Sequence, residues 1–461
     1  MLKIPKELPD SEDRVYLVGG SVRDMLMGRI PVDYDIAVFS SPRNYACKLA
    51  AAHNTRVIEL GKADKSIFHV VCRDAVFDIS RLKDAAIETD LEQRDFTINA
   101  LAYDIRSGTI IDVTGGRQDL ANKCLRMVSP SVFKQDPIRL LRAYRIAVML
   151  GFDIEYRTAA MIRECRQLIR QAAGERIRDE WFGILKCDTA AASIADMAES
   201  GLLMEIFPEL TDLAGCGQNR YHQFDVLDHT LNMFGHLETH LDGLGDFYPQ
   251  SGAALVKVMN SKHQTILKCA ALLHDIGKPA ALSLDEKGRR HYYGHEKIGA
   301  RQVDKISRRY RFSNQARESV AFIVRHHLRP LFMFNQALKG RPGNRAKARF
   351  FMACGSLVPD IVLHAVADNR GKMADPDEKY ATFVRFADNL LQDYFTGYRP
   401  KTELPPLISG HDLKKEFGLS PSPLFATVLK QVEAARFAGE ISSRSEAIHL
   451  VGTILSNHGK T

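Results

Sequence analysis

Two aspartates near the start of the chain alternate with apolar residues. Asp33 and Asp35 flank Tyr34 in the run VDYDIAVF, and Ile36 follows them. Because successive side chains of a strand point to opposite faces, we expect the two carboxylates to share one face while Tyr34 and Ile36 turn to the other. Neighbouring carboxylates repel each other and stay ionised only where cations neutralise them, and their hard oxygen atoms suit Mg²⁺. The spacing therefore predicts a magnesium site on this strand.

A glycine pair stands just before these aspartates. Gly19 and Gly20 allow a ligand to approach the backbone closely, and Ser21 with Asp24 matches the capping box of a helix that Gly28 would end. A free helix N-terminus beside glycines favours phosphate. Either motif alone is common in surface segments, but metal-binding aspartates beside a phosphate cradle indicate metal-assisted nucleotidyl transfer.

The elements that must position these residues form a small α/β domain. Between residues 14 and 114, helical stretches alternate with five strand-like runs, at residues 15–18, 34–39, 68–72, 76–79 and 109–113. From about residue 132 onward, apolar residues recur at helical spacing and strand signals nearly vanish. The helical part is expected to break near 213–224 and 248–252, with a loop near 398–406.

The length and composition set limits on the kind of protein. A chain of 461 residues is too long for one compact core, so two to four domains are expected. Hydrophobic residues make up 45% and charged residues 26%, with no apolar run long enough to span a bilayer and no signal-peptide stretch. The eight cysteines form no C-x-x-C pair, which favours reduced thiols in the cytoplasm over a thiolate zinc site or disulfides.

The charge of the chain is unevenly distributed. The formal net charge is +7, and cationic runs gather in the second half, at 289–291, 301–312, 325–329 and 339–349. A polyanionic partner would explain this distribution, although solvated helix faces explain some of the runs equally well.

The segment from Gly19 to Asp35 carries a family resemblance. Its pattern, G-G-x-V-R-D-x-L-x-G-R-x-P-x-D-x-D, resembles the signature of class II tRNA nucleotidyltransferases and the related bacterial poly(A) polymerases, in the DNA polymerase β superfamily. Further motifs follow in the family's order: FDISRLK (77–83), RDFTINALAYD (94–104), DVTGGRQDL (112–120), QDPIR (135–139) and ERIRDEW (175–181). The resemblance covers about residues 14–210 and is highly specific because so many motifs keep their order and spacing.

This resemblance implies a reaction and a set of site residues. Two Mg²⁺ ions would be held by Asp33 and Asp35, with Asp78 as the third catalytic carboxylate, near the attacking oxygen. Arg23 is expected to help bind the triphosphate, and Asp95 to accept a hydrogen bond from the ribose 2′-hydroxyl. The residues expected to bind the nucleotide are Gly19, Gly20, Ser21, Arg23, Arg94, Asp95, Asn99, Asp136, Arg139, Arg142, Arg145, Glu175, Arg176 and Arg178.

Asp136 and Arg139 suggest how a base would be chosen. Their spacing places them on one side of a helix. Cytosine and adenine each present an amino donor beside a ring-nitrogen acceptor, so a carboxylate and a guanidinium satisfy both groups. Guanine and uracil would leave buried polar groups unpaired, at about 1–3 kcal/mol each. Such a site would take CTP and ATP without a nucleic-acid template. The alternative is an ordinary ion pair within the helix.

Three positions depart from the family's pattern. Gln135 replaces the usual Glu, Gln93 replaces the first Arg of an R-R-D pattern, and the segment 61–71 lacks the glycine-threonine pattern of many members. In this family that segment influences the switch from C to A addition. Addition of C, of A or of the whole CCA end therefore stays open.

A second constellation contains histidines. His274 and Asp275, adjacent in the apolar run LLHDIGKP, resemble the signature of the HD superfamily, and the match covers about residues 225–375. The further ligands that this resemblance implies are His229, His295, Asp368 and either His326 or His327. Imidazole with carboxylate suits Mn²⁺, Ni²⁺, Fe²⁺ or Zn²⁺, and a metal hydroxide could attack a phosphoester. A phosphate at an RNA 3′ end, cyclic or terminal, is the expected substrate.

The sequence thus predicts an α+β nucleotidyltransferase head with a polymerase β-like sheet (1–125), followed by an all-α neck that selects the base (126–212), an HD domain (213–375) and an RNA-binding tail (376–461). The expected function is addition of C and/or A nucleotides to the 3′ end of tRNA from CTP and ATP, in the cytoplasm, with a phosphohydrolase activity at the HD site. Two alternatives are a poly(A) polymerase and an HD phosphohydrolase whose head binds nucleotide without catalysis. The oligomeric state stays open.

Overall fold

The computed structural model describes residues 5, 8–61, 66–82, 86–216, 225–340, 343–373, 375–420 and 422–458. By its internal contacts the chain divides into two compact units. Unit 1 contains Met1–Cys187 and Ala195–Ile206, and unit 2 contains Asp188–Ile194 and Phe207–Thr461. The division of the chain into four segments stays a prediction.

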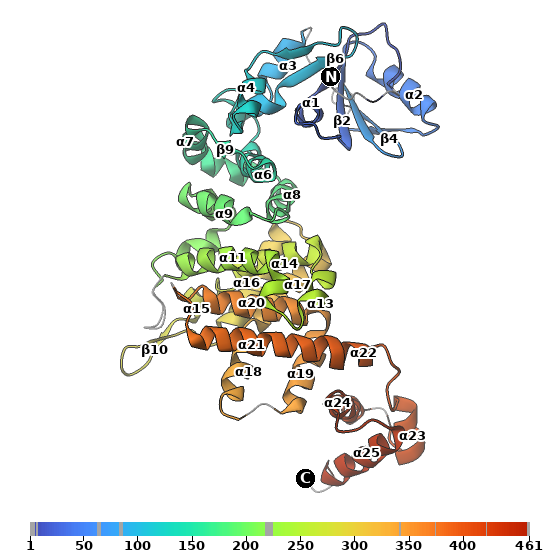
Figure 1. Cartoon of the computed structure of the whole chain (residues 1–461), viewed down its shortest axis with the longest axis vertical. Coiled ribbons are helices and arrows are strands. Elements are labelled where there is room, and N and C mark those ends of the chain that lie inside the picture. The colour runs from blue at the N-terminus through green and yellow to red at the C-terminus, as the bar shows by residue number, and fades with distance from the viewer. Residues whose placement is uncertain are drawn as a thin grey trace. The chain divides into compact units, whose positions relative to one another are not determined.

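Unit 1 is built on a seven-stranded mixed sheet with the order β3-β4-β5-β2-β1-β6-β7 (Figure 1). The strands are β1 (Val15–Val18), β2 (Asp33–Val38), β3 (Val57–Leu60), β4 (Ile67–Val71), β5 (Val76–Arg81), β6 (Leu101–Asp104) and β7 (Ile110–Asp112). Among these described strands, only β2 and β5 pair in parallel. All five predicted strand runs are confirmed, with ends that differ by at most two residues, whereas β3 and β6 were not predicted as strands.

The sheet is held by apolar side chains that pack on both of its faces. Leu17, Ile36 and Phe77 are buried on one face, which the helices α1 (Gly20–Leu26) and α2 (Pro42–Ala52) cover. On the other face, Val18 and Ala37 pack beneath α3 (Ile87–Glu92). Asp33 and Asp35 project on this second face, beyond the part that α3 covers.

Helix α1 begins differently from its prediction. Gly19 is the N-cap residue, with φ +76°, and no side chain caps the helix. The Ser21 hydroxyl donates instead to the Val18 carbonyl at 3.0 Å, and Asp24 accepts from Arg23 at 2.8 Å. The predicted capping box is therefore wrong, because a glycine with a positive φ starts the helix. Its predicted end is confirmed, since Gly28 follows the last turn with φ +74°.

The rest of unit 1 is helical apart from a short strand pair. The helices are α4 (Gly116–Ala121), α5 (Val132–Gln135), α6 (Arg139–Leu150), α7 (Tyr156–Cys165), α8 (Gly174–Leu185), α9 (Ala190–Glu199), whose first residues belong to unit 2, and α10 (Leu202–Ile206). The two-residue strands β8 (Cys124–Leu125) and β9 (Asp153–Ile154) pair in parallel. Helices α6 and α8 pack against each other. Together they carry six of the residues expected to bind the nucleotide, Arg139, Arg142, Arg145, Glu175, Arg176 and Arg178.

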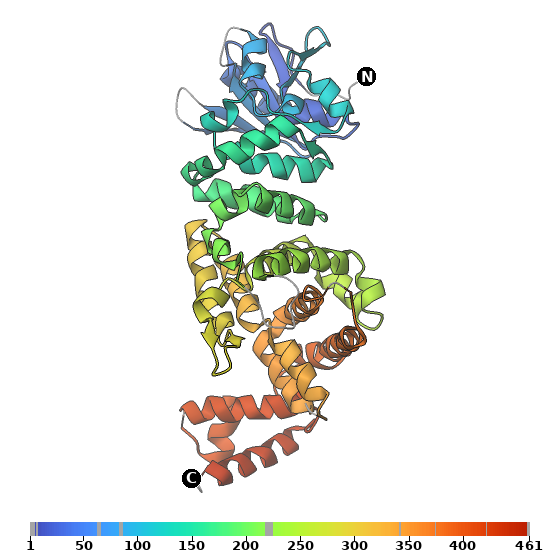
Figure 2. The same ribbon diagram turned by 90° about the vertical axis from the view of Figure 1, so that its left-hand side faces the viewer.

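In its described residues unit 2 is helical, as predicted, except for a small hairpin of β10 (Ser283–Leu284) and β11 (Arg290–His291). Its longer helices are α11 (Val226–Asp242), α13 (Gly252–Val258), α14 (Ser261–Leu273), α16 (His295–Arg309), α17 (Asn314–His326), α18 (Arg329–Ala337), α19 (Asn344–Cys354), α20 (Val358–Arg370), α21 (Glu378–Gln392), α23 (Gly410–Phe417), α24 (Pro423–Phe437) and α25 (Arg444–His458). Helices α11, α17 and α20 pack on α14, which is buried from Thr265 to its end, and α16 packs on α17 (Figures 1 and 2). Helices α23, α24 and α25 enclose a separate apolar cluster.

The predicted breaks in the helical part are confirmed at some positions and wrong at others. The break at 248–252 is confirmed, because α12 (Leu244–Phe247) ends there and α13 begins at Gly252. The loop predicted from 398 is wrong for its first residues, which continue helically through α22 (Arg399–Thr402). Most of the break predicted at 213–224 lies outside the described residues.

Among the described residues, one helical run has the length and hydropathy to cross a membrane. It covers Asn344–Arg370, which contains α19 and α20, and 72% of its apolar window is buried inside the protein. Helices in the core of a folded domain are buried in this way.

Candidate active site and metal centre

Three carboxylates gather on one face of the sheet in unit 1. Asp33 and Asp35 are exposed on β2 while Tyr34 between them is buried, as strand alternation requires. Asp78 of β5 is the register partner of Asp35 in the parallel pair. Register partners on neighbouring strands project to the same face about 4.8 Å apart, so the structure brings the three predicted catalytic residues together.

A histidine that the sequence did not single out completes this group. His69 stands opposite Asp78 in the antiparallel pair of β4 and β5. The distance from His69 Nδ1 to Asp78 Oδ1 is 2.6 Å, and both side chains are partly exposed. A histidine in the apolar run IFHVV was the available signal, but only the register of the two strands places it on Asp78.

The electrostatics of Asp35 reflect this crowding. The surrounding protein desolvates its carboxyl and raises its pKa, Arg94 opposes the rise, and the charges of Asp78 and Asp33 add to it. The residue still reaches solvent on the open face of the sheet. Repulsion between carboxylates is relieved by a bound cation, and a set of oxygen donors suits Mg²⁺. The chemistry of the donors therefore fits a magnesium site.

Gly19 lies where the backbone comes close to this site. A Cβ atom at Gly19 would lie 2.8 Å from Arg94 Nη1 and 3.4 Å from Asp35 Oδ2. Arg94 is fixed by Asp90, which accepts from its Nε at 3.1 Å and its Nη2 at 3.0 Å. The glycine thus leaves room between a held guanidinium and the carboxylates. Gly20 lies beside it, and an added Cβ would contact Arg23 at 3.5 Å.

Arg23 begins a chain of polar contacts behind the site. The residue is buried, and its Nη1 donates to Asn99 Oδ1 at 2.7 Å. Asn99 Nδ2 in turn donates to Asp95 Oδ1 at 3.1 Å, and the Phe96 amide donates to the same oxygen at 2.8 Å. Three predicted nucleotide-binding residues are therefore linked to one another.

This series of polar contacts continues through residues of α6 and α8. Arg142 Nη1 donates to Asp95 Oδ2 at 3.4 Å, and Arg142 Nε donates to Glu180 Oε1 at 3.0 Å. Arg145 donates to the other oxygen of Glu180. Glu180 is buried on α8 and was not among the predicted site residues, although it belongs to the motif ERIRDEW. A buried acid within a helix of arginines was the signal that could have identified it.

The base-reading pair differs from its prediction. Asp136 precedes Pro137 and is extended (φ −148°, ψ 98°), so it lies in the break between α5 and α6 and not on a helix with Arg139. The reason is that a residue before proline is disfavoured in the helical conformation. Asp136 accepts two hydrogen bonds from Arg176 of α8, at 2.9 and 2.8 Å. Arg139 donates to the Gln93 carbonyl at 3.2 Å.

These contacts fix the charge of Asp136. Burial works to raise its pKa, but the Arg176 guanidinium holds the pKa below its usual value. The remaining predicted residues of this region lie on α8. Glu175 lies in its first turn, and Arg178 pairs with its neighbour Asp179 at 2.8 Å.

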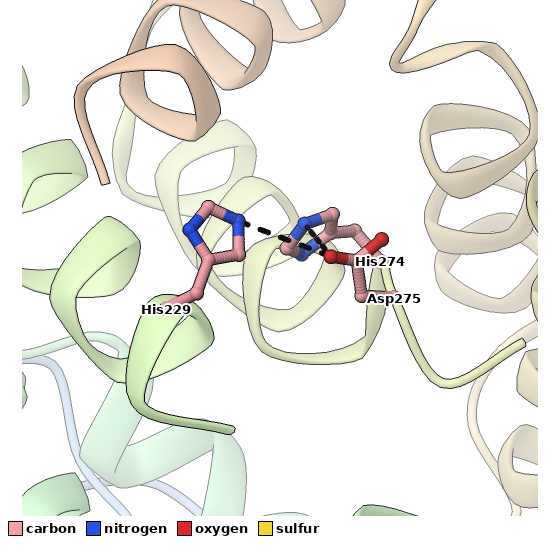
Figure 3. A group of neighbouring side chains, drawn as sticks. All are labelled: His229, His274 and Asp275. Atoms are coloured by element: carbon pink, nitrogen blue, oxygen red, sulfur yellow. Dashed lines mark ion pairs between the residues drawn. The ribbon is translucent and has the colours of Figure 1, made fainter. Parts of the chain in front are cut away.

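In unit 2, the HD residues form two groups that share Asp275. The ligand atoms of His229, His274 and Asp275 lie within 4.8 Å of one another, and so do those of Asp275, His295 and His327. His274 Nε2 is 3.0 Å from Asp275 Oδ2, and His295 Nε2 is 3.3 Å from Asp275 Oδ1. In Figure 3, dashed lines join one oxygen of the Asp275 carboxylate to the imidazoles of both His229 and His274.

Asp368 closes the first of these groups. Its Oδ1 lies 3.0 Å from His229 Nε2 and 3.7 Å from His274 Nε2. Each ligand carboxylate also accepts from a lysine: Lys372 Nζ is 2.9 Å from Asp368 and Lys278 Nζ is 2.6 Å from Asp275. Although burial works to raise it, Lys372 and His229 hold the pKa of Asp368 well below its usual value. Both carboxylates are therefore ready to bind a cation.

Three of the histidines are held in one tautomer. The Nδ1 atoms of His274, His295 and His327 lie 2.7–2.8 Å from the backbone carbonyls of Ala271, Tyr292 and Val324, respectively. A carbonyl can only accept, so each Nδ1 carries the proton and each Nε2 is left as the metal-binding nitrogen. Backbone support of this kind is typical of metal-binding histidines. The nitrogen and oxygen donors fit a transition metal.

The choice between His326 and His327 is settled by their surroundings. His327 is fully buried beside His274 and His295, with ring centroids 5.2 and 5.4 Å away. His326 is the last residue of α17, and its ring packs on Phe322 at 4.3 Å. Placing His326 among the metal ligands is therefore wrong, because neighbouring helical residues point in directions about 100° apart. His327 takes that place.

A cavity of about 680 Å³ opens over the second group, lined in part by Asp275, His295, His327 and Asp368. The cationic side chains that line it are Lys278, Lys297, Arg325, Arg329 and Lys372. Apart from the ligand aspartates, Glu296 is the one acidic residue among the described residues of its wall. A cavity with this excess of positive charge suits an anionic ligand.

Three family models match the chain in order. They are the poly A polymerase head domain at residues 15–126, a probable RNA and SrmB-binding site of polymerase A at 151–213, and the HD domain at 226–393. The carboxylate cluster falls in the first of these matches and the two histidine groups fall in the third.

Similar whole proteins carry closely related names. The A-adding tRNA nucleotidyltransferase of Deinococcus radiodurans is 30% identical over 450 residues, which cover 95% of each chain. The CC-adding tRNA nucleotidyltransferase of Thermus thermophilus is 29% identical over 93% of this chain and 91% of that relative. The Thermotoga maritima CCA-adding enzyme complexed with tRNA has the same fold, with a TM-score of 0.62 at 19% identity over 96% of this chain and 92% of that one. The chain therefore belongs to the tRNA nucleotidyltransferases, as a nucleotidyltransferase with a poly(A) polymerase head and an HD domain.

Proposed function

We propose that this enzyme adds C and/or A nucleotides to the 3′ end of tRNA, using CTP and ATP without a template, in the cytoplasm. The observation that carries the proposal is the meeting of Asp33, Asp35 and Asp78 on one sheet face, beside the space that Gly19 leaves next to Arg94. A carboxylate cluster beside a fixed cation suits a metal-bound triphosphate. The relatives named for A addition and for CC addition support the same substrate class.

The residues of the head would have different roles in the reaction. Asp33 and Asp35 would hold two Mg²⁺ ions. These ions would lower the pKa of the RNA 3′-hydroxyl and neutralise charge on the departing pyrophosphate. Arg94, fixed by Asp90, would pair with the triphosphate. Asp78 would lie beside the attacking oxygen, where His69 orients its carboxylate.

The helices behind the head would select the sugar and the base. Asp95 is positioned by Asn99 and Arg142 to accept from the ribose 2′-hydroxyl. The Asp136 carboxylate uses part of its acceptor capacity on Arg176 and keeps lone pairs for the amino group of cytosine or adenine. Arg139 would donate to the neighbouring ring nitrogen. Guanine and uracil present the opposite pattern and would be rejected.

One experiment tests the product. Purified enzyme is incubated with tRNA ending at the discriminator base, at C or at CC, with each labelled nucleoside triphosphate supplied separately, and the products are read by length. Addition of one to three residues that stops at the CCA end supports the proposal. Long runs of A on any RNA end would assign a poly(A) polymerase instead, and no addition to any acceptor would contradict the proposal.

A second function is favoured by the two ligand groups that share Asp275 beneath the cationic cavity. A transition metal there, of the class Mn²⁺, Ni²⁺, Fe²⁺ or Zn²⁺, would supply a hydroxide for hydrolysis of a phosphoester. Lys297, Arg325 and Arg329 would hold the anionic substrate, for which we propose an RNA end that carries a 2′,3′-cyclic or a 3′-phosphate. Removing this phosphate would free the hydroxyl that the head extends.

Phosphate release tests this second function. Chelator-treated and metal-reloaded enzyme are compared on RNAs with each phosphate end. Release that returns only with metal supports the proposal, whereas equally poor release from both preparations contradicts it. Asp33→Ala with Asp35→Ala should abolish nucleotide addition and spare this release. If addition survived the double substitution, the head would not be the catalytic site.

A further inference from the structure

His364 is a buried histidine whose ring nitrogens both lack a hydrogen-bond partner among the described residues. It lies on α20, one turn before the metal-ligand candidate Asp368, and none of its surface is exposed. A neutral imidazole has one donor and one acceptor, so two polar atoms are buried without compensation. Such a group in a folded protein requires an explanation.

The other buried histidines of unit 2 do not share this property. His240 donates or accepts at both nitrogens, with the Tyr248 hydroxyl at 3.0 Å and the Tyr380 hydroxyl at 2.9 Å. His274 and His327 each have a backbone carbonyl on Nδ1. The described surroundings of His364 therefore offer it no polar partner from the protein, which distinguishes it from a histidine that stabilises the core.

The neighbours of His364 are the metal-ligand candidates themselves. Its ring centroid lies 5.1 Å from that of His274 and 5.4 Å from that of His327. The corresponding distances within the two ligand groups are 5.6 Å between His229 and His274, and 5.4 Å between His295 and His327. His364 is therefore as close to these ligands as they are to one another.

The ring of His364 would have to turn to reach a metal held by these ligands. In its present orientation His364 belongs to neither three-residue ligand group. No hydrogen bond from the described residues has to be broken for that turn.

We propose that His364 supplies a further imidazole ligand to a transition metal bound beside His274 and His327. The proposal rests on the metal centre proposed for the HD residues and enlarges its set of donors. A site with three imidazoles in addition to carboxylate favours a nitrogen-preferring ion such as Co²⁺, Ni²⁺ or Zn²⁺ over Mg²⁺. A buried polar atom without a partner is then retained because it serves the bound state and not the metal-free fold.

Replacement of His364 by an apolar residue distinguishes a metal ligand from a residue that stabilises the metal-free fold. In His364→Leu, the metal-free protein should melt at the same temperature or higher, because an unpaired polar group has been removed. The same variant should bind Co²⁺ at least tenfold more weakly and show an altered visible absorption of the bound ion. The measurements are thermal melting of chelator-treated protein and titration with Co²⁺ alone, followed by calorimetry and absorption.

His240→Leu is the matched control, because this histidine is equally buried in the same unit but is fully hydrogen-bonded. It should lower the melting temperature of the metal-free protein and leave Co²⁺ affinity and spectrum unchanged. Should His364→Leu fail to fold, His364→Gln is measured in its place, with the same loss of affinity expected.

Unchanged Co²⁺ affinity and spectrum in the His364 variants would overturn the proposal. Failure of the unsubstituted protein itself to bind Co²⁺ would overturn the metal centre as a whole, and this result is recognisable before any variant is made.

Discussion

His69 on β4 and Asp78 on β5 stand directly opposite each other, with 2.6 Å between His69 Nδ1 and Asp78 Oδ1. The third carboxylate of the head is thus held by an imidazole from the neighbouring strand. An oriented carboxylate acts on a reacting group without having to reorganise during the reaction. We therefore expect the two residues to act as a pair during nucleotide addition.

The first prediction concerns this pair. His69→Ala should lower kcat for nucleotide addition about tenfold, because the charge-assisted hydrogen bond to Asp78 is lost. The KM for ATP should stay nearly unchanged, because no contact to the nucleotide is removed. His69→Gln should restore part of the rate. The control is Glu59→Ala, an exposed change on the adjacent strand β3. Equal kcat in His69→Ala and Glu59→Ala would remove His69 from the site.

The second prediction concerns base selection. Asp136→Ala should raise the KM for CTP and ATP and reduce discrimination against UTP and GTP about tenfold, because the acceptor for the amino group is gone and Arg176 is released. Competition between labelled triphosphates measures the discrimination. Asp179→Ala, at an exposed position of α8, the helix that carries Arg176, is the control. Unchanged discrimination in Asp136→Ala would place base selection elsewhere.

The third prediction compares two ion pairs of unit 1. Glu180 is buried and binds both Arg142 and Arg145, so Glu180→Ala should destabilise the protein by about 3 kcal/mol. Glu199 is exposed and pairs only with the exposed Arg163 at 3.3 Å among the described residues, so Glu199→Ala should change stability by less than about 0.5 kcal/mol. Denaturant unfolding measures both. Similar effects of the two substitutions would contradict the network.

The fourth prediction concerns pH. Burial lowers the pKa of His240 to about 4, with His236 and Arg370 adding to the effect. The unfolded value is about 6.5, so protons favour the unfolded state. The stabilising contribution of neutral His240 is complete above pH 6.5 and is lost as the pH falls toward 4.

This contribution amounts to about 2 kcal/mol between pH 7 and pH 5. His240→Phe, although less stable at pH 7, should lose less stability over that interval than the unsubstituted protein. Unfolding by urea at both pH values, with chelator present, measures the difference. His449→Phe, at an exposed position, should keep the full loss. A loss in His240→Phe as large as that of the unsubstituted protein would refute the assignment.

Much of the head could be predicted because its signals are local. The alternation of Asp33, Tyr34 and Asp35 determines which side chains share a face once the segment is a strand. The helix end at Gly28 likewise depends on a residue that accepts a positive φ. The fold class of both units follows from the change of apolar period from two to about 3.6.

The errors have physical causes that residue spacing does not show. The spacing of Asp136 and Arg139 predicts one helix face, but Pro137 disfavours the helical conformation of the residue before it. The sequence motif does not distinguish His326 from His327, because only the packing of α17 decides which of them faces the proposed metal centre.

The residues that were missed depend on tertiary contact. His69 meets Asp78 through strand register, and Glu180 meets Arg142 from 38 positions away along the chain. His364 lies in an apolar helix, where its sequence neighbours give no sign of the histidines around it. None of these pairings can be deduced without the fold.

Incorporation of labelled ATP and CTP into tRNA by Asp35→Asn enzyme, compared with unsubstituted enzyme at matched Mg²⁺, tests the central claim most directly. Asp35→Asn keeps the size of the side chain while removing the charge that holds the cation. We predict at least a thousandfold loss of incorporation with an unchanged melting temperature. Retention of incorporation within tenfold would show that the carboxylates on β2 and β5 are not the transferase site.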